Sequence, residues 1–398
     1  MNRSFHGHRD TIPALVRALC AAALAVPLAA AAGSGVVPHA FSLVATPTPA
    51  QAYQLHAPLV QGPDGLLYGA GWYGGEGDDG TVFRVESDGT ITVLHVFDGT
   101  DGSQLPTGLL VGADGWLYGT TQFGGGPDGR GVVFKISTAG EFVLLHTFSK
   151  NLDGGQGWPS GRMVQDAQGN FFGTLCQNHV LPGALFKMAP DGSVTIVHRF
   201  QDQGDGSCPD ALAMGPDDTI YGTTAYTNDD YGGTLFSYPA AGGRLRTLHT
   251  FVCASDGCQP YGLMAIGPDK AIYGAAPLGG ADGVGTVYRV GYNGDFSVIY
   301  DFTNGGALGQ IPQGGLTRDA TGTLYSTTEF GGRNGGGVVF AMTRNGTGHV
   351  LHAFGRAKSA NGYNPVSSPL LLPGGLLYGT TLAGGAGGGT VWLVTLGQ

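Results

Sequence analysis

Histidine is the residue whose spacing in this sequence most clearly suggests chemistry. One histidine recurs roughly every 50 residues, each time two positions before a phenylalanine. The set comprises His39, His95, His146, His198, His249 and His352, with Tyr300 at the same position once. Imidazole nitrogens bind zinc and transfer protons near neutral pH, so a repeated histidine is a candidate metal or catalytic residue. The elements that carry these histidines decide whether they can meet.

Two acidic loops could bind a cation. Residues 98–102 read Asp-Gly-Thr-Asp-Gly and residues 202–206 read Asp-Gln-Gly-Asp-Gly. Calcium loops place several oxygen ligands around the ion and usually end with a glutamate, and neither segment has that spacing. Turn-forming aspartates are therefore favoured, with weak calcium binding as the alternative, and we expect neither a metal nor a cofactor.

Aromatic residues next to repeated Gly-Gly pairs, with one glutamate, are the best ligand-binding candidates. They are Trp72, Tyr73, Phe123, Tyr226, Glu329 and Phe330. Exposed aromatic rings can stack on sugars or hold a peptide. An aromatic residue at a repeated position can equally serve as packing between structural units, and this alternative stays open. Trp72 and Glu329 are favoured as ligand contacts because they differ from their counterparts in other repeats.

The four cysteines beyond residue 32 predict two disulfides in an oxidising compartment. Cys253 and Cys258 lie in one connection, and Cys176 and Cys208 lie in two loops expected at the same end of the fold. We favour the pairs Cys253–Cys258 and Cys176–Cys208 among three connectivities. Metal ligation by these thiols is the alternative.

A repeat of about 52 residues positions all these side chains. Its landmark is an aromatic residue followed by glycine or serine, at Tyr68, Tyr118, Phe172, Tyr221, Tyr273, Tyr325 and Tyr378. Each copy holds four short segments whose Val, Ile, Thr and aromatic content favours strands. Asp-Gly and Asn-Gly pairs separate several of these segments and supply the positive φ angles of tight hairpins.

Seven copies of four antiparallel strands predict an all-β fold, a seven-bladed β-propeller. The seventh copy stops after its third strand, whereas residues 37–41 (Val-Pro-His-Ala-Phe) match residues 350–354 (Val-Leu-His-Ala-Phe). We therefore expect an N-terminal strand at 34–41 to pair into the last blade and close the ring. The mature chain, residues 33–398, is expected to form a single domain.

This architecture changes the interpretation of the histidines. One residue on the outermost strand of each blade cannot converge on an ion that needs Zn–N distances of about 2.0–2.1 Å. Half-buried histidines that hydrogen-bond to a threonine or a backbone group are favoured instead. The loops between second and third strands share one end of the propeller with the blade connections, so we expect any binding site there, near the channel mouth.

Residues 1–32 have the composition of a secretory signal peptide, because three arginines precede an apolar run that ends in small residues. No other apolar run approaches 18 residues, so the mature chain should lack a membrane span. A net charge of −10 argues against nucleic acid as a partner. We expect an exported monomer, periplasmic or extracellular.

The pattern Leu-Tyr-Gly-Thr-Thr, Gly-Gly, Gly-Thr-Val-Phe and Leu-His-x-Phe resembles the bacterial exported tandem-repeat family called GloVer-containing. All seven copies match, so the resemblance covers nearly the whole mature chain. It implies a propeller-like exported protein and carries over no catalytic residue.

The leading functional hypothesis is a binding or scaffold protein that recognises a glycan or a protein partner at the loop-rich end. An exported lyase or hydrolase with a site at the channel mouth, and a purely structural surface protein, are the alternatives. No nucleophile elbow, phosphate loop or metalloprotease helix is present, so binding is favoured over catalysis. Arg162, Asp210, Arg318 and Glu329 are scattered residues that an enzyme could use, without a recognisable geometry.

Overall fold

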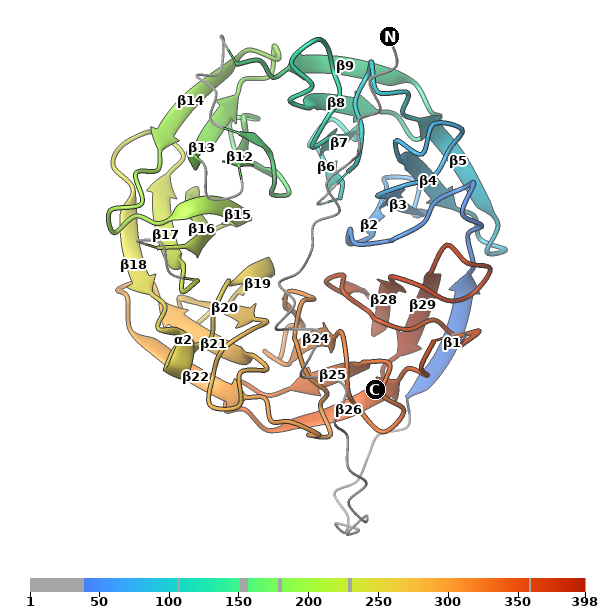
Figure 1. Ribbon diagram of the computed structural model, residues 1–398, viewed down its shortest axis with the longest axis vertical. Coiled ribbons are helices and arrows are strands. Elements are labelled where there is room, and N and C mark those ends of the chain that lie inside the picture. Colours follow the sequence, from blue (N-terminus) through green and yellow to red (C-terminus); the bar gives the residue numbers. More distant parts are fainter. Residues whose placement is uncertain are drawn as a thin grey trace, which may run out of the picture. The chain divides into compact units, whose positions relative to one another are not determined.

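The computed structural model describes residues 39–105, 108–150, 157–177, 181–227, 231–357 and 359–397. The unit that starts at Pro38 forms seven antiparallel blades around a central axis, and the predicted seven-bladed β-propeller is confirmed (Figure 1). Within the described ranges the only helix is α2 (Cys253–Asp256), and none is long and apolar enough to cross a membrane. The predicted signal peptide lies outside these ranges.

Each blade has the same strand order from the axis outward, and the third blade has its first strand split in two. The innermost strands are β2 (Val60–Gln61), β6 (Leu110–Val111), β10 (Trp158–Pro159) with β11 (Val164–Gln165), β15 (Ser207–Met214), β19 (Tyr261–Ile266), β23 (Thr317–Arg318) and β27 (Leu370–Leu372). The second strands are β3 (Leu67–Gly71), β7 (Leu117–Thr120), β12 (Phe171–Gln177), β16 (Thr219–Tyr226), β20 (Ala271–Ala276), β24 (Leu324–Thr328) and β28 (Leu376–Thr381).

The outer half of each blade is the Gly-Thr-Val-Phe strand followed by the His-x-Phe strand. The third strands are β4 (Thr81–Val85), β8 (Val132–Ile136), β13 (Leu181–Met188), β17 (Thr234–Pro239), β21 (Thr286–Gly291), β25 (Val338–Met342) and β29 (Thr390–Thr395). The fourth strands are β5 (Ile91–Val96), β9 (Phe142–Thr147), β14 (Val194–Arg199), β18 (Arg246–Thr250), β22 (Phe296–Asp301), β26 (Gly348–Ala353) and β1 (Ala40–Ala45).

The N-terminal strand closes the ring, as the repeat count predicts. β1 pairs antiparallel with β29 and becomes the outermost strand of the seventh blade. β1 completes the seventh blade as its fourth strand, so the outer edge of this blade matches those of the other six blades. Figure 1 shows this strand, at the blue end of the chain, beside the red C-terminal strands.

The predicted position of the closing strand is wrong by several residues. Val391 pairs with Ala45, whereas its counterpart Val339 in the sixth blade pairs with His352. Ala45 therefore occupies the histidine position, and the sequence match that placed His39 there, with a strand at 34–41, is a misalignment. The register follows the pairing of β1 with the buried face of β29 rather than the local His-x-Phe pattern.

The aromatic-Gly landmark is explained by packing within each blade. In six blades the glycine of the second strand faces an aromatic residue of the third strand, as Gly222 faces Phe236. A Cβ on Gly222 would lie 2.2 Å from the Phe236 ring, so the position has no room for a side chain. The third-strand aromatics are fully buried: Phe83, Phe134, Phe186, Phe236, Tyr288, Phe340 and Trp392.

The polar residues of the repeat are also structural. The landmark tyrosine donates a hydrogen bond to the aspartate of the preceding turn, as Tyr118 does to Asp114 at 2.8 Å. In three blades the first threonine after the landmark glycine or serine donates to a backbone carbonyl of the next blade, as Thr174 does to Asp210 at 3.1 Å. The second threonine accepts a hydrogen bond from the backbone N–H at the start of the third strand, as Thr121 does from Val132. These contacts satisfy buried polar groups and connect neighbouring blades.

Candidate functional site at the mouth of the central channel

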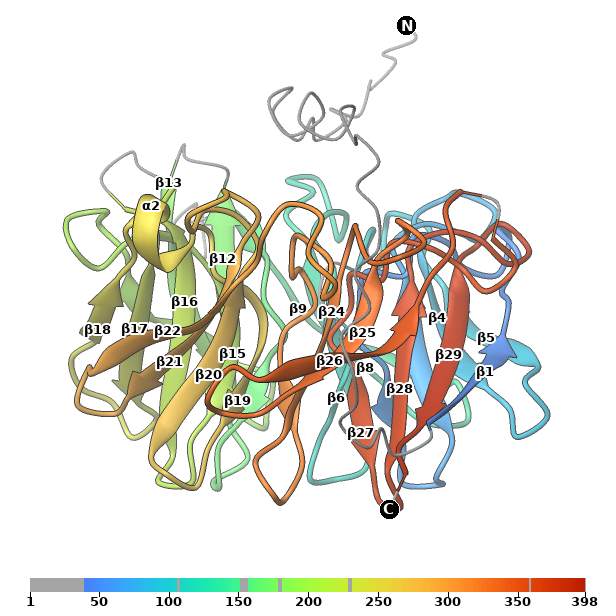
Figure 2. The ribbon, with the colours of Figure 1, turned by 90° about the horizontal axis from the view of Figure 1, so that it is seen from below.

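One end of the propeller carries a cavity to which all seven blades contribute. Figure 2 shows α2 and the longer loops at one end and short turns between strands at the other. The cavity has a volume of about 410 Å³ and lies where the innermost strands begin and the second strands end. A larger cavity of about 820 Å³ follows the innermost strands along the channel. The two share Pro58, Arg162, Leu212 and Leu263, so these residues mark the floor of the mouth cavity.

The repeated histidines lie on the outer strands, away from this cavity. His95 approaches Asp101 with an Nε2–Oδ2 distance of 2.8 Å, and its ring stacks on Phe142 of the next blade. His198 and His249 contact aspartates in the same way, each at 3.0 Å. The structural interpretation holds, but the partner is a loop carboxylate rather than the predicted threonine or backbone group.

The acidic loops provide the carboxylates that contact two of these histidines. Asp101 and Asp205, from the two loops considered as calcium sites, are the carboxylates that contact His95 and His198. Asp98 accepts backbone hydrogen bonds within its own turn. Among the described residues there is no group of three or more His, Cys, Asp or Glu side chains that could hold a metal ion.

Of the six predicted ligand contacts, Trp72 is the one that lines the mouth cavity. Tyr73 turns to Tyr53, with ring centroids 5.1 Å apart, and Phe123 meets Trp158 edge-on at 5.5 Å. The backbone of Phe330 pairs with Gln310 in an isolated bridge. The aromatic position before the glycines is thus mainly used to pack the loops together.

Tyr226 and Glu329 do not line the cavity. Tyr226 packs edge-on against Tyr231 at 5.7 Å, and it is close enough to Tyr261 to contribute to the raised pKa of that phenol. Glu329 is buried and accepts a hydrogen bond from the Asn364 amide at 3.3 Å. Burial raises the pKa of Glu329 to about 7.

Arg162 and Asp210 converge on the mouth cavity, although they are 48 positions apart in the sequence. Arg162 lies between β10 and β11, the two halves of the first strand of the third blade, and Asp210 lies in an irregular part of β15 in the fourth. Neither forms an ion pair with any residue that the structure describes, and the guanidinium Nε of Arg162 is buried without a hydrogen-bond partner. Two unpaired groups of opposite charge in one cavity are typical of a functional site.

Burial dominates the electrostatics of this cavity. It raises the pKa of Asp210 to about 7, and a backbone hydrogen bond from Gly262 acts weakly in the opposite direction. It lowers the pKa of Arg162 to about 10 and that of His56 to about 4. The pKa of Tyr261 is raised well above its ordinary value, first by burial and then by Tyr226 and Asp210. At neutral pH the cavity therefore holds a cationic arginine, a neutral histidine and an aspartate near its titration midpoint.

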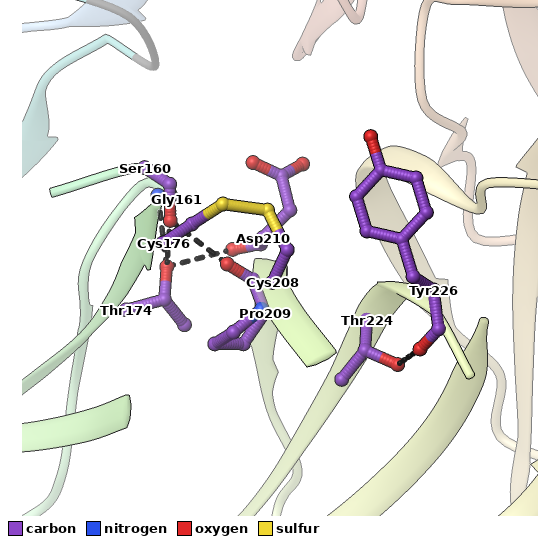
Figure 3. The surroundings of a disulfide bond; sticks show 9 residues. All are labelled: Ser160, Gly161, Thr174, Cys176, Cys208, Pro209, Asp210, Thr224 and Tyr226. Atoms are coloured by element: carbon purple, nitrogen blue, oxygen red, sulfur yellow. Dashed lines mark hydrogen bonds between the residues drawn. A yellow bond between two sulfur atoms is a disulfide. The ribbon is translucent and has the colours of Figure 1, made fainter. Parts of the chain in front are cut away.

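A disulfide and several hydrogen bonds hold Asp210 in place. Both predicted disulfides are confirmed, Cys176–Cys208 and Cys253–Cys258. Cys208 is two residues before Asp210, and Cys176 lines the cavity. Thr174 donates to the Asp210 carbonyl, and Ser160 donates to the Pro209 carbonyl at 2.8 Å. Figure 3 shows the Asp210 carboxylate extending away from this disulfide, to the same side as the Tyr226 ring.

The sequence contained a signal for part of this site. The fourth position after the landmark aromatic residue differs between copies and includes Trp72, Gln122 and Cys176, all three of which line the cavity. His56 comes from the segment before β2, and Tyr261 is the first residue of β19. The segment before the first strand varies in length between copies, and no sequence pattern identifies either residue.

Similar solved structures share the fold at low sequence identity. The extracellular domain of a proposed one-component system from B. thetaiotaomicron matches with a TM-score of 0.59 and 12% identity, over 88% of this chain and 39% of its own. An oligogalacturonate lyase in complex with manganese matches with a TM-score of 0.56 and 12% identity, over 90% and 97% of the two chains. A proposed 6-phosphogluconolactonase from Bacteroides fragilis matches with a TM-score of 0.55 and 18% identity, over 79% and 87%.

These neighbours are propellers of different activities, so they establish the fold and not the reaction. The present chain spans 39% of the length of the first of them. No curated protein sequence matches the chain. The Gloeobacter/Verrucomicrobia repeat model matches residues 37–213 and 177–392, which together cover nearly all of the propeller. The chain therefore belongs to the Gloeobacter/Verrucomicrobia repeat family.

Proposed function

We propose that this protein is an exported binding protein that holds a glycan in the mouth cavity of its propeller. The observation that carries the proposal is the convergence of Trp72, Arg162 and Asp210 from three blades on one cavity of about 410 Å³. Small-ligand sites have volumes of roughly 300–1,000 Å³ and combine apolar walls with a few polar groups. A glycan fits this composition better than a protein partner, which generally binds a broader and flatter surface.

Trp72 would supply the apolar face of the site and the polar side chains its specificity. An aromatic ring stacks on the apolar face of a sugar, while its hydroxyls hydrogen-bond to carboxylates, amides and guanidinium groups. Gln122 has a buried side-chain oxygen without a partner in the same cavity, and a sugar hydroxyl could donate to it. The two disulfides indicate an oxidising, extracytoplasmic environment, which agrees with the export predicted from residues 1–32.

A calorimetric screen of mono- and oligosaccharides against the mature chain tests the proposal. We expect binding that Trp72→Ala weakens up to about tenfold, because an aromatic contact contributes about 0.5–1.5 kcal/mol beyond area burial and about 1.4 kcal/mol corresponds to a factor of ten. Trp116→Ala is the matched control. Trp116 follows the turn Asp114-Gly115 at the opposite end of the propeller, where Lys135 lies 4.5 Å from its ring centroid. Equal losses in both variants, or no glycan bound by the wild type, would contradict the proposal.

An exported lyase or hydrolase is the second candidate, and the environment of Asp210 favours it. A carboxyl with a pKa near 7 beside Tyr261 is suited to general acid or base catalysis. The same glycans incubated with the protein and analysed for new reducing ends or unsaturated products test this alternative. Product that disappears in Asp210→Asn would replace the binding proposal with an enzymatic one.

A further inference from the structure

The floor of the mouth cavity carries a positive charge that no residue in the described ranges neutralises. Arg162 lines both the mouth cavity and the deeper one, so it lies where the two meet. Its Nε is buried without a hydrogen-bond partner, and within the described part of the chain its side chain makes no ion pair. Arg162 as a whole is half-buried, and the buried Nε loses its hydration without a compensating hydrogen bond, which is costly.

Arg318 provides a comparison, because it is a channel arginine whose guanidinium group hydrogen-bonds to backbone carbonyls of the protein. It lines the deeper cavity, where its Nε donates to the Ile266 carbonyl at 2.7 Å and its Nη1 donates to the Asp319 carbonyl at 3.0 Å. No carbonyl of the described residues accepts a hydrogen bond from Arg162. The difference points to a bound ligand, rather than a described residue of the chain, as the partner of Arg162.

Asp210 does not serve as that partner. The pKa of Arg162 is shifted by burial alone, with no carboxylate acting on it. The pKa of Asp210 is likewise shifted by burial, opposed by the Gly262 backbone and not by an arginine. The two groups therefore occupy separate places in one cavity, and a ligand of suitable length can contact both.

Resting on the proposed glycan-binding function, we propose that the mouth cavity takes a sugar acid whose carboxylate pairs with Arg162 and whose hydroxyls contact Asp210 and Gln122. A guanidinium and a carboxylate form two parallel charge-assisted hydrogen bonds, the strongest match available to an arginine. The unpartnered Gln122 Oε1 can accept a hydrogen bond from a hydroxyl group. Asp210 can accept a hydroxyl hydrogen bond when ionised and donate one when protonated.

The whole chain carries a net charge of −10 and would repel an anion at a distance. Selection for a sugar acid must therefore be local, which makes Arg162 the decisive residue. His56, the other basic side chain on the cavity wall, is neutral at physiological pH because burial lowers its pKa to about 4. The cavity offers a cationic amino sugar no fully ionised carboxylate whose attraction would compensate for the ammonium group's lost hydration.

Calorimetric titration of the mature protein with glucuronate, galacturonate, glucose and glucosamine tests this inference, followed by the oligosaccharides of each uronate. We expect the uronates to bind about tenfold or more tightly than glucose, as charge-assisted bonds to an arginine require. Arg162→Gln should reduce that ratio to about one. Arg162→Lys should keep part of it, because the charge remains while the paired geometry is lost.

Arg318→Gln is the matched control, because it removes a channel arginine that already has partners; the uronate preference should survive in this variant. Thermal unfolding of each variant verifies that it folds. Equal binding of uronates and glucose by the wild type would overturn this inference and leave the glycan proposal intact. Preferred binding of glucosamine would also overturn it, since Asp210 would then set the preference. Absence of binding to every sugar would overturn both.

Discussion

Replacing Asp210 by asparagine is expected to change stability in a way that depends on pH. Burial raises the pKa of this carboxyl from 3.8 in the unfolded chain to about 7 in the folded one. The folded state thus holds the proton more tightly, and the wild type loses stability as the pH rises between these two values. The loss begins above pH 3.8 and is complete above pH 7. Asparagine has nearly the same shape and never ionises, so the variant avoids this loss.

The size of the effect follows from the two pKa values. They lie about 3 pH units apart, and at 1.36 kcal/mol for each unit the upper limit is about 4 kcal/mol. Asp210 is half-buried and faces a channel that water can enter, so solvent screening reduces the expected effect to about 1–2 kcal/mol. With an unfolding entropy of about 2.1 cal/mol/K per residue over about 360 residues, this corresponds to roughly 1–3 °C in Tm.

Differential scanning calorimetry of both proteins from pH 4 to pH 9 measures the effect. The Tm of Asp210→Asn relative to wild type should rise between pH 4 and pH 7 and then stay constant. Subtracting the wild-type curve removes the contribution of Glu329, whose raised pKa acts with the same sign. Glu141→Gln, at an exposed glutamate, is the control for the effect of replacing a carboxylate by an amide on the surface. A Tm difference for Asp210→Asn that does not vary with pH would refute the reasoning.

Two further predictions concern the closure of the ring and its crosslinks. Deleting the chain through Ala45 removes the closing strand Ala40–Ala45, which should lower Tm by more than about 5 °C and promote self-association through the exposed β29 edge. Calorimetry and size-exclusion chromatography measure these two effects. Deletion through residue 38 should leave Tm and oligomeric state unchanged, and equal behaviour of the two truncations would contradict the register. Replacing both cysteines of a pair by serine should lower the free energy of unfolding in urea by about 4 kcal/mol for Cys176–Cys208 and by about 2 kcal/mol for Cys253–Cys258, because their sequence separations are 32 and 5 residues. The opposite ranking would show that loop closure does not govern their contributions.

The repeat made the architecture predictable. Each copy buries an aromatic residue of its third strand against a small residue of its second, as Phe236 against Gly222, and that small residue is glycine in six copies and Ser326 in the other. Strand number, ring closure and both disulfides follow from local patterns and from the end at which each loop emerges. The partner of the repeated histidines did not follow, because aspartates such as Asp101 and Asp205 come six or seven residues later in loops of different sequence.

The register of the closing strand shows a second limit. His39 and Phe41 imitate the repeated motif locally, but Ala45 occupies the histidine position. Phe41 instead stacks on His352 of the sixth blade, with ring centroids 3.5 Å apart. The alignment depends on which face of the strand meets β29, and that contact spans almost the entire chain.

By itself, the sequence determined that this is a closed ring of seven four-stranded blades whose repeated residues form the scaffold. Only the tertiary structure decided where its chemistry lies. Trp72, Arg162 and Asp210 belong to three blades and share no motif, so nothing in their spacing indicates that they meet. They share one cavity because a closed ring brings the beginning of every innermost strand to the same axis, and burial there changes the pKa of each charged group.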